Sequence, residues 1–233
     1  MKHASHSGAM VTMDGTTPPN SMAHDHFKQV MVNGEDRTRE LAFFAEQLGL
    51  PALAPGRYSV VFVIDLLVLS TTSRGLGQPY RVMDELRHLE GHGPNSLTKA
   101  PTPFTRKPLA GLWHKHYRQE GLRSFAINMQ KALHKYGMPA LESRVRPADQ
   151  ESEIMTEEIL REVIDDAVLG NYRRRAADQQ MTGEWIVYAK KNGQNYYLAL
   201  GTHGNDVGIF QRIQRLCVHE FPFLRLQLGL SEA

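Results

Sequence analysis

The sequence predicts an α+β fold in which several amphipathic helices pack on a small, mainly antiparallel sheet that includes a C-terminal β-hairpin. One observation is that apolar residues recur at three- and four-residue steps in several segments, which is typical of amphipathic helices. A second is that residues 185–200 hold two aromatic and β-branched runs separated by a turn signal. The third is composition: 233 residues, 41% hydrophobic and 22% charged, suffice to bury a globular core.

The chain is expected to consist of a disordered leader and one folded domain. Residues 1–33 are rich in Ser, Thr, Gly, Pro, Met and His and show no periodicity, whereas residues 34–233 predict a single α+β domain. The single cysteine, Cys217, favours a reducing compartment. No apolar run reaches the roughly 20 residues of a membrane span, and no signal-peptide core is evident. We therefore expect a cytoplasmic protein with no membrane partner.

The first half of the domain is expected to alternate helix, strand and loop. Residues 35–48 predict a helix, because Leu41, Phe44, Ala45 and Leu48 follow helical spacing and Gly49 supplies a stop. The β-branched and aromatic run 58–64 predicts a buried strand that continues to about residue 69, although Asp65 is unusual there. Residues 70–78 then predict a loop and residues 82–89 a short helix. Four prolines in 91–108 predict a long proline-rich loop.

The second half is expected to hold two amphipathic helices, the hairpin and a terminal helix. Residues 124–136 should turn Phe125, Met129, Leu133 and Tyr136 to one face, and residues 154–169 repeat the pattern. A type I′ turn at Asn192-Gly193 should pair Trp185 with Leu200, Val187 with Leu198, Tyr188 with Tyr197 and Ala189 with Tyr196. Asp206 is a candidate cap for a final helix carrying Ile209, Ile213 and Leu216, and residues 221–224 should anchor the terminus.

Reactive side chains are densest between Gly111 and Arg118, where two histidines, two cations, a tryptophan and a tyrosine follow the proline-rich loop. If this segment is a strand, His114 and His116 point to the same side; if it is helical, they diverge. His203 stands at the outgoing end of the hairpin, where a rigid scaffold could hold a reactive group. A surface basic segment anchored by Trp113, and a turn role for His203, fit these residues as well.

The first functional hypothesis is metal-independent, toxin-like cleavage of RNA. His114 or His116 would act with His203 as base and acid, while Lys115, Arg118 and Arg123 would bind the substrate and stabilise the charged phosphorane. Helices followed by a small antiparallel hairpin with a histidine at its edge resemble metal-independent ribonuclease toxins. That resemblance is architectural, covers only about the last fifty residues and carries no shared motif.

Two alternatives stay open. A zinc-dependent hydrolase would use His114, His116 and His203 as ligands, with His219 or Cys217 as a fourth, although zinc, phosphate-loop, dinucleotide and serine-nucleophile signatures are absent. A non-enzymatic nucleic-acid-binding or adaptor protein would use Arg173, Arg174 and Arg175 together with the basic region 99–146, which holds ten Lys or Arg against two acids. Residues 149–168 hold eight acids against one arginine, so the two regions could instead attract each other or simply face solvent.

Overall fold

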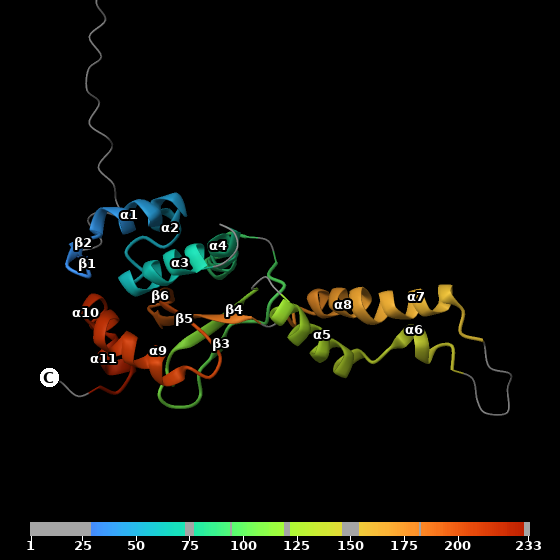
Figure 1. Cartoon of the computed structure of the whole chain (residues 1–233). Coiled ribbons are helices and arrows are strands. Elements are labelled where there is room, and N and C mark those ends of the chain that lie inside the picture. The colour runs from blue at the N-terminus through green and yellow to red at the C-terminus, as the bar shows by residue number, and fades with distance from the viewer. Residues whose placement is uncertain are drawn as a thin grey trace, which may run out of the picture.

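The computed structural model describes residues 29–72, 77–93, 95–118, 122–145, 154–181 and 183–230. A four-stranded antiparallel sheet lies between two groups of helices, and a helical arm extends away from this body (Figure 1). The predicted α+β class, with amphipathic helices on a small antiparallel sheet that includes a C-terminal hairpin, is confirmed. In the part of the chain that the structure describes, no helix has the length and apolarity needed to cross a membrane.

The body is formed by both ends of the described chain. Its N-terminal part holds β1 (Met31–Val32), β2 (Glu35–Asp36), α1 (Thr38–Gln47), α2 (Leu50–Leu53), α3 (Val60–Thr72), α4 (Gly77–Leu89), β3 (Thr102–Pro103) and β4 (Trp113–Tyr117). Its C-terminal part holds β5 (Glu184–Lys191), β6 (Gln194–Gly201), α9 (Asp206–Arg212), the π-helix η2 (Ile213–Cys217), α10 (Val218–Glu220) and α11 (Leu224–Gln227). The arm inserted between them holds α5 (Leu122–Tyr136), α6 (Pro139–Glu142), α7 (Glu157–Asp165), the π-helix η1 (Asp166–Gly170) and α8 (Asn171–Ala177).

The hairpin forms as predicted, with one change of register. The sheet order is β3-β4-β5-β6, and Asn192 and Gly193 both have the positive φ that a type I′ turn requires. The predicted pairs Tyr188 with Tyr197 and Ala189 with Tyr196 are confirmed. Beyond them a β-bulge between Val187 and Tyr188 shifts the register by one, so Val187 pairs with Ala199 and Trp185 with Gly201, and those two predicted pairs are wrong.

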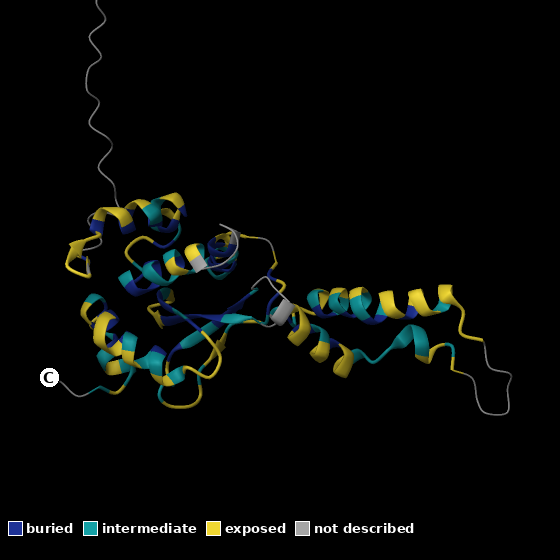
Figure 2. Cartoon of the chain, in the orientation of Figure 1, coloured by how far each residue is buried: buried dark blue, intermediate teal, exposed yellow. Residues whose placement is uncertain are grey.

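Each face of the sheet packs on its own set of helices. On one face, Ile186 and Tyr188 belong to a buried cluster with α1, α3 and α4. On the other, Val187 and Ala189 join a cluster with α9, η2 and the C-terminal segment, in which Phe221 and Leu224 are buried as predicted. Figure 2 shows the sheet buried between these layers and exposed residues along the outer faces of the helices.

The predicted strand 58–69 is wrong, because residues 60–72 form the helix α3, in which Phe62, Val63 and Leu66 are fully buried. Its continuous apolar run fits a helix buried all round as well as a strand, and tertiary packing decides between them. The contacts of Asp65 account for a charged residue in this apolar run. Its carboxylate accepts a hydrogen bond from Leu200 N and pairs with both terminal nitrogens of Arg212, at 2.7 Å each. This pair covers backbone groups on the free edge of β6.

Three other boundaries need correction. Residues 1–28 of the predicted disordered leader lie outside the described residues, but Val30 is buried in the core and residues 31–32 form β1. The predicted loop 70–78 overlaps the end of α3 and the start of α4, and the proline-rich segment 91–108 contains the short strand β3.

The predicted terminal helix also differs in two residues. Asp206 is the first residue of α9 and makes no side-chain cap, while Leu216 is half exposed because η2 offsets the helical phase.

The arm is only two helices thick, which changes the predicted packing faces. Of the α5 side chains that the structure describes, Asn128 and Ala132 are buried, whereas Phe125 and Leu133 are exposed. Residues 154–169 divide between α7 and η1, with Ile154 and Leu160 exposed. An ion pair between Arg144 and Glu162 joins the basic region 99–146 to the acidic region 149–168.

Glu220 predicts a pH-dependent stability. Both of its carboxylate oxygens accept a hydrogen bond from Val60 N at the start of α3, and burial raises the pKa of this carboxyl to about 7. Since the folded pKa exceeds the unfolded value, the folded state binds the extra proton between about pH 4.5 and 7, and the corresponding stability is lost as pH rises through that window. In the wild type, the free energy of unfolding should therefore fall by on the order of 2 kcal/mol between pH 5 and pH 8, and Glu220→Gln should abolish this decrease. Urea unfolding at the two pH values measures it. An unchanged pH dependence in Glu220→Gln would contradict this assignment.

Candidate active site

Strand β4 resolves the question left open for the histidine pair. Residues 113–117 are extended, so His114 and His116 project from the same side of the sheet, with ring centroids 5.5 Å apart. The ring of His203, which follows β6, stacks on His116 at a centroid distance of 5.4 Å. The structure therefore brings together the three histidines that the sequence singled out from two distant segments.

Trp185 and Gly183 hold the histidine cluster, which we define as His114, His116 and His203, in place. The Trp185 ring lies 5.2 Å from that of His114 and 4.3 Å from that of His203. The carbonyl oxygen of Gly183 accepts hydrogen bonds from His116 Nδ1, at 2.8 Å, and from His203 Nε2, at 3.1 Å. Position 183 requires glycine, because a Cβ there would collide with the backbone carbonyl of Tyr117.

The histidine cluster combines buried and accessible groups. His116 is nearly buried, His114 is half-buried and His203 is exposed. Burial lowers the pKa of His114, with further lowering from His203 and Lys99, and burial lowers the pKa of His116 to about 4. Both buried imidazoles are therefore neutral at pH 7, and neutral imidazole accepts a proton.

Two buried polar atoms, one in the histidine cluster and one in the adjoining Trp185, have no hydrogen-bond partner among the described residues. They are His114 Nδ1 and Trp185 Nε1. Buried polar atoms are nearly always paired in folded proteins, and exceptions gather at functional sites. The cluster therefore has free hydrogen-bonding capacity, which a packed structural cluster would normally satisfy.

Comparisons with protein-family models, curated proteins and solved structures found no match.

Lys115 does not join the histidines. It alternates with them along β4, faces α4 and is completely buried. Its ammonium donates to Ser96 Oγ, Thr98 Oγ1 and the Lys99 carbonyl at 2.7 to 2.8 Å, and it lies 3.2 Å from Glu85. The predicted substrate-binding role of Lys115 is therefore replaced by a structural one on the opposite face of the sheet.

The structure describes the side chain of only one of the two predicted arginines. Arg118 lines a small cavity of about 260 Å³ with Arg81 and Glu85, on the α4 side of the sheet. Arg123 is in α5, and its side chain lies outside the described residues. Sequence reasoning placed all three cations with the histidines because they are close in the chain, but strand alternation separates Lys115 from them.

Lys99 and Trp185, rather than the three predicted cations, lie beside the histidine cluster. Lys99 lies close enough to lower the pKa of both His114 and His116, and Trp185 contacts all three histidine rings. The sequence placed His203 at the end of the hairpin but did not predict its contact with Trp185, which follows from the shifted register that pairs Trp185 with Gly201. The position of Lys99 depends on backbone pairing between residues 98–99 and Met181, for which the sequence carries no signal.

Metal ligation receives little support from the geometry. Within the described ranges, no group of three or more His, Cys, Asp or Glu side chains is arranged to hold a metal ion. Cys217, considered as a fourth zinc ligand, is buried in the core, where its thiol donates to the carbonyl of Leu198. Hydrogen bonds to the Gly183 carbonyl occupy one nitrogen each of His116 and His203.

Proposed function

We propose that this protein is a metal-independent ribonuclease that acts on RNA in the cytoplasm through His114, His116 and His203. The observation that carries the proposal is the contact of the buried His116 ring with two others, that of half-buried His114 and that of exposed His203. Paired histidines with different environments can divide the roles of base and acid. Lys99 supplies positive charge next to the position of the reacting phosphate.

The proposed reaction needs no group beyond these side chains and the RNA. His114 or His116 takes the proton from a 2′-hydroxyl, whose oxygen then forms a bond to the adjacent phosphorus. The bond from phosphorus to the 5′-oxygen of the next nucleotide breaks, and His203 donates a proton to that oxygen. The products are a strand with a 2′,3′-cyclic phosphate and a strand with a free 5′-hydroxyl.

Cleavage of a mixed-sequence single-stranded RNA tests the proposal. We expect cleavage to yield 2′,3′-cyclic phosphate ends, detected by mass spectrometry, and we expect an all-deoxy strand of the same sequence to stay intact because it lacks the attacking hydroxyl. Cleavage of the DNA strand, or no cleavage of RNA, would contradict the proposal. Binding of RNA without cleavage would favour the adaptor hypothesis.

The same assay with a chelator separates the metal-free mechanism from a zinc hydrolase. We expect an unchanged rate after exhaustive treatment with EDTA, because no step uses a metal ion. A rate that falls with EDTA and returns with Zn²⁺, together with one zinc per chain by elemental analysis, would replace this mechanism with the zinc alternative.

The pH profile gives a further prediction. A general base must be unprotonated, and the pKa values of His114 and His116 are both lowered, so the acidic limb should lie below the ordinary histidine value. We expect activity to persist below pH 6 and to fall as pH drops toward about 4 if His116 is the base. An acidic limb with a midpoint at or above pH 6.5 would exclude both buried histidines as the base.

A further inference from the structure

A cavity of about 650 Å³ lies at the β6 edge of the sheet, between α3 and the segment formed by α9 and η2. Asp65, Val68 and Leu69 line it from α3 and share one helical face, because they are three and four residues apart. Leu200 lines it from the end of β6. A volume of this size is typical of sites that bind small organic molecules. The sheet edge therefore offers a second candidate binding site.

This cavity is distinct from the histidine cluster, although one loop borders both. Thr202 and Asn205 line the cavity. His203 lies between them in the chain, but its ring stacks on that of His116 and contacts that of Trp185. No member of the histidine cluster is among the described residues that line the cavity. The proposed cleavage of RNA therefore leaves this space unused.

The π-helix η2 directs a row of side chains toward the cavity. Gly208, Arg212 and Leu216 follow one another at four-residue steps, and all three line it. Such steps drift around a regular α-helix but stay closer to one face across a π-turn, whose hydrogen bonds span five residues. The neighbouring row, one residue further along, is buried in the core and consists of Ile209, Ile213 and Cys217. Since π-turns are frequent at functional sites, η2 is an independent indication of a binding role.

The cavity combines exposed apolar walls with one uncompensated cation. Val68 on α3 and Leu216 on η2 are each 50% exposed, although both side chains are large and apolar. Asp65 and Arg212 neutralise each other through two contacts of 2.7 Å. Arg215 also lines the cavity, is exposed and makes no ion pair within the described part of the chain. A matching ligand needs an apolar body and a negative charge.

We propose that this cavity binds a small organic carboxylate, whose apolar part covers Val68 and Leu216 and whose head group pairs with Arg215. The planar guanidinium can bind both carboxylate oxygens at once, which fixes the orientation of the ligand. A carboxylate matches the single charge of Arg215 better than a doubly charged phosphate does. Arg212 is already held by Asp65 and by the carbonyl of Leu200, so it forms a fixed part of the wall. The site does not depend on the proposed ribonuclease activity.

Isothermal titration calorimetry of the full chain with three probes tests the proposal. Octanoate carries an apolar chain and a carboxylate, octan-1-ol carries the same chain without the charge, and acetate carries the head group without the chain. We expect octanoate to bind at a single site, roughly tenfold or more tightly than either of the others, because it alone uses both parts of the cavity. Equal affinity for octanoate and octan-1-ol would overturn the role of Arg215. Absence of octanoate binding would overturn the site.

Two variants locate the binding in the cavity. Arg215→Gln should weaken octanoate binding roughly tenfold and leave octan-1-ol binding unchanged, because only the charged contact is lost. Leu216→Gln should weaken the binding of both probes, because it removes apolar surface that both would cover. Both side chains are exposed, so circular dichroism and thermal unfolding should show intact folds.

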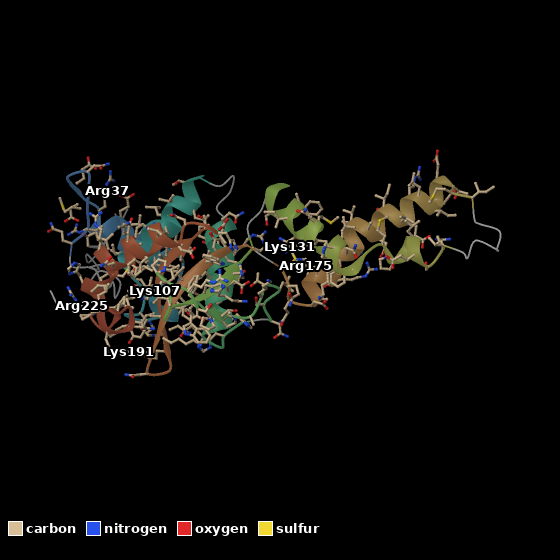
Figure 3. All side chains as sticks on the ribbon, turned by 90° about the horizontal axis from the view of Figure 1, so that it is seen from below. Arg37, Lys107, Lys131, Arg175, Lys191 and Arg225 are labelled. Carbon is tan, nitrogen blue, oxygen red and sulfur yellow. The ribbon has the colours of Figure 1, made fainter. Side chains whose placement is uncertain are left out.

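Arg173→Gln and Leu226→Gln are the matched controls. Arg173 is also exposed, but it belongs to α8 of the arm, whose base is marked by Arg175 in Figure 3. Leu226 is exposed on α11 and is not among the described residues that line the cavity. We expect both controls to bind octanoate as the wild type does. Octanoate binding that Arg215→Gln and Leu216→Gln leave unchanged, or that the controls weaken to the same extent, would overturn its assignment to this cavity.

Discussion

His203→Ala is expected to reduce the rate of RNA cleavage by about 10²- to 10⁴-fold, the usual contribution of a general acid. The fold should survive this substitution, because His203 is exposed and its ring packs on the surface side of Trp185 and His116. Initial cleavage rates at substrate saturation measure the effect, and circular dichroism and thermal unfolding verify the structure.

His219→Ala provides the matched control for His203→Ala. His219 is also exposed, but it lies on α10, and among the described residues no ring contact joins it to the histidine cluster. We expect this variant to cleave RNA at the wild-type rate. If His203→Ala and His219→Ala were equally active, His203 would have no part in the chemistry and the proposed pairing of acid and base would fail.

Lys115→Ala is expected to destabilise the protein by about 3–5 kcal/mol, enough to unfold many single domains. Lys115 is completely buried, and its ammonium is surrounded by oxygen atoms of Ser96, Thr98 and Lys99. Removing it leaves the buried carboxylate of Glu85 and several oxygen atoms without their cation. Urea unfolding followed by tryptophan fluorescence measures the loss.

Two further variants test the reason for that loss. Lys107→Ala, at an exposed lysine in the loop before β4, should leave stability within about 0.5 kcal/mol of wild type. Neutralising the partner as well, in Lys115→Met with Glu85→Gln, should recover part of the stability because no unpaired charge remains. A fully stable Lys115→Ala that binds RNA weakly would restore the substrate-binding role that the sequence predicted.

The sequence predicted those parts of the fold that depend on local rules. Asn192-Gly193 set the hairpin turn because both positions require positive φ, and the alternation in β4 followed directly from extended geometry. The apolar run of α3 predicts a strand although it forms a helix, because a continuous apolar run has no periodicity that distinguishes a helix from a strand. The bulge at Val187 was also invisible, since an extra residue in one strand leaves the apolar pattern almost unchanged.

For the candidate site, the sequence by itself determined that His114 and His116 share a face if extended, and that His203 stands at the end of the hairpin. Only the tertiary structure decided that these segments meet, because β4 pairs with β5 across the insertion of the whole arm. Packing likewise buried Lys115 among Ser96, Thr98 and Glu85, apart from the histidines. The physical reason is that side-chain direction is a local property of a strand, whereas the proximity of distant charges depends on how the whole chain packs.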